Sequence, residues 1–531
     1  MSSTFLRKYW LSFVRFMKGN LLFYLVLGIN LVLLSVTKFY PTMDGPAHLH
    51  NSNLLINLLT GNAIVSDFYI INNITIPNWT SHILLSLFNA VLPGWLAEKL
   101  FLYTYIAGMA FSFRYFLKQT NPNNLYLSIF IFPFSYTFLF HLGFYNFCLS
   151  FIFLFLTLGY YIKNIDVVSI SKYLLLSFLL LLCYYSNILI FGFLGLTLGT
   201  FIIQTTISYY NKGHDVSTAL RYFLKNVFFL FVSSLPSLIF ALRFSIQTNF
   251  FQSDQQYTFQ ELLRWIVDVR PLIVYAYHSD KILTSSFFYI LLLLTSFIIF
   301  KKTGKRNEFI NTHFLLPPLL LSVLLFFLIP DGSGAGLMST RFAIIVYVYA
   351  LLYVISMAKN IQFNSIILIL IVSLHFGLLF KHLNGTIKKL DKHARVLYET
   401  GKKIENNSVI LSVNLSDHWM ELHLSNYIGI DKPIIILENY EASTGWFPVA
   451  WNTERIPNVL LGDQNGVADI TWPSNINSSK RKQINNIVLY GNIEKLQVEK
   501  WNELRTVLFK NYKLTYTSPD KYVQLYKQIP Q

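Results

Sequence analysis

Long apolar runs recur along the first 380 residues or so, and they constrain the fold more than any other feature of the sequence. A helix needs about 20 predominantly apolar residues to cross the hydrocarbon core of a bilayer. The chain of 531 residues is 54% hydrophobic and only 13% charged, which is far more apolar than an average soluble domain. We therefore predict a polytopic α-helical membrane protein. Its predicted spans, about eleven in number, cover residues 21–38, 96–116, 125–140, 147–161, 173–186, 188–207, 222–242, 285–300, 314–329, 342–357 and 366–380.

The basic residues between these runs predict the orientation, because Lys and Arg accumulate in cytoplasmic loops. They precede the first run and cluster most strongly at Lys301, Lys302, Lys305 and Arg306. This topology explains the net charge of +16 better than a nucleic-acid partner does. We expect an integral protein of a bacterial inner (plasma) membrane, with a cytoplasmic N-terminus and an extracytoplasmic C-terminal domain. Residues 79–92 are apolar but only about fourteen residues long, so we expect an interfacial helix there; a span would reverse the later loops.

The composition divides the chain into two predicted domains. Residues 1–381 form the membrane domain, with a first outer loop at 39–95 and another outer loop at 244–284. After residue 381 the apolar runs shorten and charges appear among them. We predict a soluble α/β domain over 382–531 that covers a membrane site or binds an acceptor. Its predicted strands are 408–413, 433–437, 487–490, 513–517 and 522–526, with a helix at 494–512.

The sharpest candidate for chemistry is Asp44, which lies where the chain leaves the first apolar run. A carboxylate at an apolar boundary has its basicity raised by desolvation, so Asp44 can act as a general base. His48 follows one helical turn later and can contact the same substrate. The simpler interpretation is structural: Asp44 is a helix N-cap, Gly61 ends the helix, and His48 and His50 are interfacial histidines near water. The two interpretations are compatible, because a cap can also be a base.

Arg341 is the second candidate, because a guanidinium at the outer boundary of a span can bind phosphate oxygens bidentately. The alternative is a side chain that reaches ordinary lipid headgroups. Candidate substrate-binding residues, among them His50, also lie in or next to outer segments. Trp265 and Tyr275 can stack on a sugar. Asn146 and Asn187 suit a polar ligand, although hydrogen bonding between helices explains them equally well.

Taken together, these features resemble the GT-C class of polytopic glycosyltransferases. The resemblance rests on Asp44-Gly-Pro-Ala-His48 in the first outer loop, two amphipathic segments after it, Arg341-Phe342 entering a late span, and an α/β domain after the last span. It implies inverting transfer of a sugar from a polyprenyl-phosphate donor to a glycan, lipid or protein acceptor. By position, Asp44 would be the catalytic carboxylate and Arg341 would hold the leaving phosphate. Gly45 stands where a second acidic residue often follows in the family, which argues against a metal-assisted mechanism. We expect no other cofactor, and a divalent metal stays open.

Two other functions remain open from the sequence. A transporter or flippase for a lipid or glycan tends to have ionisable groups near the bilayer midplane and internal repeats. Apart from His375 in the last run, the sequence shows neither. A glycan polymerase or ligase of a different fold would depend on the 244–284 loop rather than on Asp44.

Overall fold

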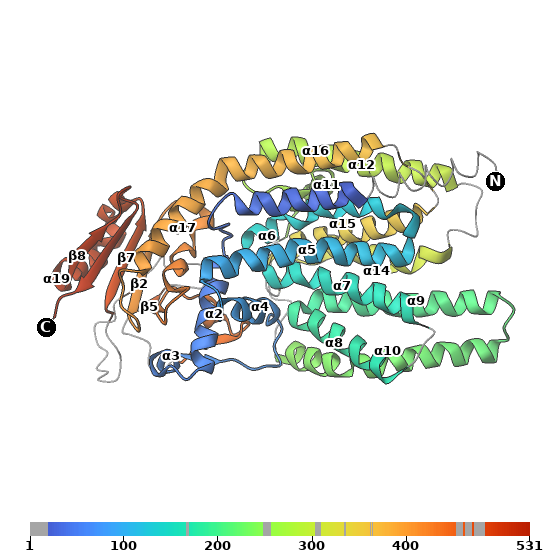
Figure 1. Cartoon of the computed structure of the whole chain (residues 1–531), viewed down its shortest axis with the longest axis horizontal. Helices are drawn as coiled ribbons and strands as arrows, with labels where there is room; N and C mark the ends of the chain where they lie inside the picture. Colours follow the sequence, from blue (N-terminus) through green and yellow to red (C-terminus); the bar gives the residue numbers. More distant parts are fainter. Residues whose placement is uncertain are drawn as a thin grey trace. The chain divides into compact units, whose positions relative to one another are not determined.

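A computed structural model of the chain describes residues 20–165, 169–247, 256–302, 310–333, 336–359, 361, 363, 365–452, 460–461, 470–471 and 484–530 (Figure 1). The basic N-terminal residues, Lys305 and Arg306 lie outside the described residues.

The chain divides into two compact units. One, here called the helical unit, comprises Met1–Leu33, Thr104–Phe140 and Phe147–His382. The other, here called the mixed unit, comprises Leu34–Tyr103, His141–Asn146 and Leu383–Gln531. The mixed unit therefore joins the C-terminal segment to the loop that follows the first apolar run.

Seven of the described helices are long and apolar enough to cross a membrane, which indicates a membrane-embedded protein. Shorter apolar helices occupy Asn20–Ser35, Ile170–Ser186 (α8) and His313–Leu328, which contains α14 (Leu316–Leu328). The predicted count of eleven spans is not confirmed. The seven are α5 (Gly94–Thr120), α7 (Tyr145–Asn164), α9 (Ile188–Asn211), α10 (Val216–Gln247), α12 (Tyr277–Lys302), α15 (Met338–Met357) and Ile366–Gly401, which joins α16 (Ser365–His382) to α17 (Lys388–Gly401).

One predicted span is not a continuous α-helix. Residues 125–140 fall in a 3-10 helix, Pro122–Ser135, and a short helix α6, Phe138–Leu142. Pro133 lies within this segment, and proline removes a backbone donor and disrupts the α-helical hydrogen-bond ladder. Apolar length alone therefore overestimated the number of regular spans.

Burial differs sharply among the helices of the helical unit. Almost every side chain of α15 is buried, so this helix lies in the interior of the unit. By contrast, α10 and α12 expose large apolar side chains such as Phe228 and Leu293. Apolar surface of this kind suits lipid contact. Helices α8, α9 and α10 pack side by side, as Figure 1 shows.

The main sheet of the mixed unit has the strand order β3-β2-β7-β9-β8. Strands β3, β2 and β7 are parallel, and β9 and β8 continue the sheet antiparallel. All the strands predicted after residue 381 are confirmed, whereas the predicted helix 494–512 is a pair of 3-10 turns followed by the shorter α19 (Asn502–Asn511). The strands of this sheet are β2 (Val409–Leu415), β3 (Ile435–Ile436), β7 (Asn486–Gly491), β8 (Tyr512–Thr517) and β9 (Val523–Gln528).

Two short helices from the first outer loop complete the mixed unit. Helix α2 (Gly45–Leu59) packs against α4 (Thr80–Asn89) and against a 3-10 helix from the C-terminal segment, Leu424–Gly429. Strand β1 (Tyr69–Ile71) pairs antiparallel with β4 (Val449–Trp451), and a separate two-stranded pair joins β5 (Leu460–Leu461) to β6 (Ile470–Thr471). As predicted, Gly61 follows the end of α2 in the left-handed conformation, at φ +77°. The first loop and the C-terminal segment thus share one core.

The central strand β7 gives a direct test of this core. Leu489→Ala removes a fully buried side chain, so we expect the mixed unit to lose about 2–5 kcal/mol of stability. Leu514→Ala on the edge strand β8 is the matched control, because Leu514 is 43% exposed and its loss should cost under about 1 kcal/mol. Thermal unfolding of the full chain, monitored through proteolytic cleavage of the C-terminal segment, measures the loss of stability in both variants. Equal losses in the two variants would contradict the sheet order.

Candidate functional site

Short hydrogen bonds fix the backbone around Asp44. The amides of Met43 and Asp44 donate to the carbonyls of His141 and Leu142, at 2.9 and 3.0 Å. Asp44 occupies the N-cap position of α2, as expected, but its side chain makes no capping hydrogen bond. The hydroxyl of Thr42 accepts the Gly45 amide instead, at 3.1 Å. The backbone at Asp44 is therefore held in place by hydrogen bonds, while the Asp44 side chain is not used as a cap.

The Asp44 carboxylate is buried, and its Oδ1 accepts no hydrogen bond from the described residues. Nε2 of His423 lies 3.7 Å from this oxygen, within ion-pair range but too far for a hydrogen bond. Burial raises the pKa of Asp44 to about 6, although the imidazoles of His423 and His48 oppose that shift. Asp44 is thus a buried carboxylate beside His423 and the Tyr440 hydroxyl, and its pKa is raised toward neutral pH.

A second carboxylate, that of Glu438, lies against the other side of the His423 ring. Nδ1 of His423 contacts Glu438 Oε1, and Glu438 Oε2 accepts a hydrogen bond from the Asn426 amide at 2.6 Å. The Tyr440 ring stacks on the imidazole, with ring centroids 4.1 Å apart. Burial opposes a charge on His423, but the nearby carboxylates, chiefly Glu438, raise its pKa above the usual value. The ring is held in one orientation between Asp44 and Glu438.

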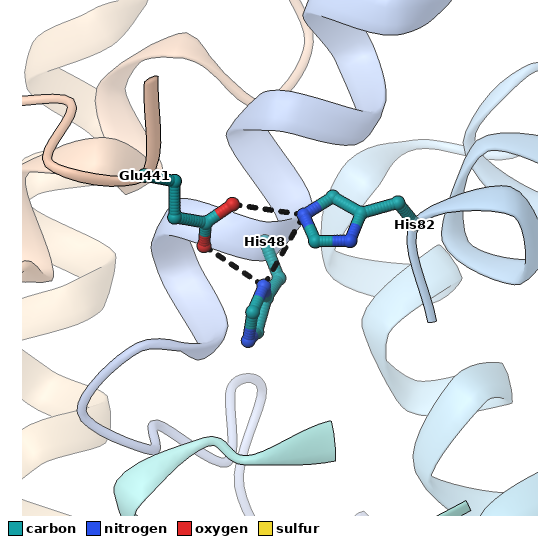
Figure 2. Close-up of side chains that lie close together, drawn as sticks. All are labelled: His48, His82 and Glu441. Carbon is teal, nitrogen blue, oxygen red and sulfur yellow. Dashed lines mark hydrogen bonds and ion pairs between the residues drawn. The ribbon is translucent and has the colours of Figure 1, made fainter. Parts of the chain in front are cut away.

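A buried cluster of His48, His82 and Glu441 lies in the same unit (Figure 2). His48 comes from α2, His82 from α4 and Glu441 from the short helix α18 (Glu441–Thr444). The two carboxylate oxygens of Glu441 lie 2.8 Å from His48 Nδ1 and 2.8 Å from His82 Nε2. Those two ring nitrogens are 3.3 Å apart. The side chains are at most 3% exposed, so the cluster lies away from bulk solvent.

The electrostatics of the cluster favour the ionised carboxylate. Burial by itself would raise the pKa of Glu441, yet the adjacent imidazoles hold it well below its usual range. Burial opposes a charge on both rings; the pKa of His48 is nevertheless raised by Glu441, whereas that of His82 is lowered. One oxygen of Glu441, Oε2, accepts the Asn51 amide at 2.8 Å, whereas Oε1 has His48 Nδ1 as its partner at 2.8 Å. The cluster can hold either a proton or a metal ion.

The other predicted residues of the mixed unit have structural partners. His50 is fully buried, and its ring nitrogens contact Asn426 Oδ1 at 3.1 Å and the Ile434 carbonyl at 3.0 Å. The interpretation that His48 and His50 lie near water is therefore wrong, because α2 packs against the C-terminal segment of the same unit. Asn146 accepts the Ser81 amide at 2.8 Å and donates to a backbone carbonyl at 2.9 Å, which anchors the start of α4.

The remaining predicted residues lie in the helical unit. Asn187 caps α9 by accepting the amide of Leu189 at 3.1 Å. Arg341 is buried near the start of α15, and its Nε donates to the Gly336 carbonyl at 3.0 Å. Trp265 lies on helix α11 (Phe259–Val267), where the Arg270 guanidinium lies 5.5 Å from its ring centroid. The Tyr275 ring packs edge-on against His382.

Four residues of the site were not predicted from the sequence: His82, His423, Glu438 and Glu441. A usable signal exists for the two glutamates, because Glu438 follows the buried strand β3 after one residue and Glu441 begins the next helix, α18. In sheets with parallel strands, ligands bind beyond the carboxyl ends of the strands. The histidines carry no comparable local signal, since their partners are distant in sequence.

Comparisons with known proteins do not identify a family for this chain. A scan against protein-family models gave no match, and a search of curated proteins gave no significant match. The function must therefore be inferred from the geometry of the described site.

Gly143 tests how tightly the Asp44 segment is packed. Its φ of +89° lies in the left-handed region, and a Cβ there would lie 2.8 Å from the Asp44 backbone nitrogen and Cβ. We expect Gly143→Ala to cost about 2 kcal/mol or more, from left-handed strain and overpacking. Gly385→Ala is the control, because a Cβ there meets nothing within 4 Å. Thermal unfolding of the full chain compares them, and an unchanged Gly143→Ala protein would contradict the described packing.

Proposed function

We propose that the protein is a membrane-embedded glycosyltransferase that moves a sugar from a polyprenyl-phosphate donor to an acceptor hydroxyl at the extracytoplasmic face. The observation that carries the proposal is the Asp44 carboxylate, which is buried, held by backbone hydrogen bonds and left with one oxygen without a hydrogen bond among the described residues. A buried polar atom without a hydrogen bond destabilises the fold, and a catalytic role is one explanation for its presence. In the proposed reaction, Oδ1 of Asp44 accepts the acceptor's proton.

The contacts of His423 support a base at this position. Its Nε2 faces Asp44 Oδ1 at 3.7 Å, and its Nδ1 is held by Glu438. A carboxylate that fixes one nitrogen of an imidazole orients the ring and stabilises its charged form. We propose that His423 positions the Asp44 carboxylate through the charge on its imidazole ring. Glu438 then acts through His423, as a positioning residue.

The apolar helices support a lipid-borne donor. A polyprenyl chain is soluble only in the bilayer, and seven helices of membrane-spanning length and composition suit a protein that works on such a substrate. In the proposal, the Arg341 guanidinium binds the donor phosphate, because its planar donors match phosphate oxygens. Arg341 lies in the helical unit, and we propose this role from the phosphate-binding chemistry of its guanidinium.

The proposed step balances as a displacement at the anomeric carbon. The acceptor oxygen forms a bond to that carbon while its proton passes to Asp44, and the bond between the carbon and the phosphate oxygen breaks. The bonding electrons stay on the phosphate, whose negative charge a positioned cation stabilises. Attack opposite the leaving phosphate inverts the anomeric configuration. The products are the glycosylated acceptor and the polyprenyl phosphate.

Asp44→Asn tests the proposal. Asn is nearly isosteric and keeps the backbone contacts but cannot take up the proton, so we expect transfer to fall at least about 100-fold at equal folded yield. Asp67→Asn in α3 (Ala63–Phe68) is the control, because Asp67 lies in the same outer loop but outside the site, and it should keep wild-type transfer. The assay follows release of polyprenyl phosphate from a panel of polyprenyl-phosphate sugars, with glycan, lipid and peptide acceptors.

Two results would contradict the proposal. If the wild-type protein releases polyprenyl phosphate and Asp44→Asn does so equally fast, Asp44 is not the base. If folded wild-type protein in vesicles consumes no donor with any acceptor but moves the donor lipid between leaflets, the chain is a transporter.

A further inference from the structure

We propose that His48, His82 and Glu441 bind one divalent transition-metal ion, for which zinc is the best match. This inference does not rest on sugar transfer, and it would stand if that proposal failed. Imidazole and carboxylate are ligands that zinc takes in proteins, and two histidines with one glutamate form a known type of zinc set. The three residues are far apart in sequence, yet their ligand atoms lie within 4.8 Å of one another (Figure 2).

The outward contacts of His48 leave its inward nitrogen ready to coordinate. Its Nε2 lies 2.8 Å from the Gly143 carbonyl, which can only accept a hydrogen bond. Nε2 therefore carries a proton, and the Nδ1 of a neutral ring presents its lone pair to Glu441. Metal-bound histidines usually donate their second N–H to a carbonyl or carboxylate in this way.

His82 presents its inward nitrogen in the same manner. Its Nδ1 faces outward, 3.4 Å from the Ser81 hydroxyl. Its Nε2 points to the Glu441 carboxylate at 2.8 Å, and Figure 2 shows both rings directed at that group. Donor atoms from three different segments, α2, α4 and α18, thus converge on one small volume.

The separations fit an ion after a small expansion. Tetrahedral zinc with bonds of about 2.0–2.1 Å places its ligand atoms about 3.3 Å apart. The two nitrogens are already 3.3 Å apart, and each lies 2.8 Å from a carboxylate oxygen. A displacement of a few tenths of an ångström at Glu441 therefore makes room. Two histidines and one glutamate supply three protein ligands, the number that zinc sites with an open fourth position use.

The charge and the burial also call for a cation. With two neutral imidazoles the cluster would carry one buried negative charge, and the lone pair of His48 Nδ1 would face Glu441 Oε1 at 2.8 Å. A buried carboxylate whose charge is not compensated is strongly disfavoured. The Phe447 ring packs beside both imidazoles, with centroids 5.6 Å away in each case. A bound ion would be enclosed by these side chains.

Metal analysis of the full chain tests the proposal without any activity assay. The protein is purified in detergent with a tag that contains no histidine, and its content of manganese, iron, cobalt, nickel, copper and zinc is measured by mass spectrometry. We expect about one equivalent of one of these metals in the wild type. Less than about 0.2 equivalents should remain in His82→Gln and Glu441→Gln.

His50→Gln is the matched control for metal content. His50 is also a buried histidine of α2, but its ring contacts Asn426 and Ile434, so the variant should keep its metal. Size-exclusion chromatography checks that each variant is folded. If a variant does not fold, the wild type is stripped and reloaded with cobalt, which should give the visible absorption of a four-coordinate site.

Three results would overturn the proposal. They are a wild-type protein that holds no transition metal even after dialysis against zinc, a metal content equal to wild type in both cluster variants, or reloaded cobalt with only the weak absorption of an octahedral aqua ion. The first would mean that a proton shared between His48 and Glu441 compensates the buried charge.

Discussion

The stability of the mixed unit depends on how the negative charge of one fully buried carboxylate is compensated. Glu441 is fully buried, and its oxygens contact one ring from α2 and one ring from α4. A buried charge is tolerated only when its partners are well placed, and loss of one partner is strongly destabilising. The contact therefore links the position of α2, which begins directly after Asp44, to a residue almost four hundred positions further along the chain.

The site keeps two acidic groups in opposite environments. Glu441 is surrounded by imidazoles and an amide, so its pKa is held well below the usual range. Asp44 is also buried but has an oxygen without a hydrogen bond among the described residues, and its pKa is raised to about 6. Two carboxylates whose surroundings separate their pKa values in this way suit two different roles. In this account Glu441 holds the site together and Asp44 acts on substrate.

Much of the fold could be predicted from local patterns. Apolar runs of spanning length predicted the helical unit, and the short apolar runs after residue 381 predicted the strands of the main sheet. Residues 125–140 show the limit of this method, because an apolar run with an internal proline has the length of a span without forming a continuous helix. Asp44 was predicted from its position after an apolar run, yet His82 and Glu441 were not. These residues come together only through packing between segments that are far apart in the sequence, so no local spacing predicts their contact. The same packing buries His50 away from water.

The most direct test of the account is an X-ray absorption spectrum of the full chain loaded with one equivalent of zinc. The account predicts a first shell of nitrogen and oxygen atoms at about 2.0–2.1 Å, with the outer-shell scattering of two imidazole rings, and loss of that scattering in His82→Gln. A first shell of oxygen atoms alone, without imidazole scattering, would contradict it. The ion would then lie elsewhere on the protein, and the buried Glu441 would be compensated by a proton.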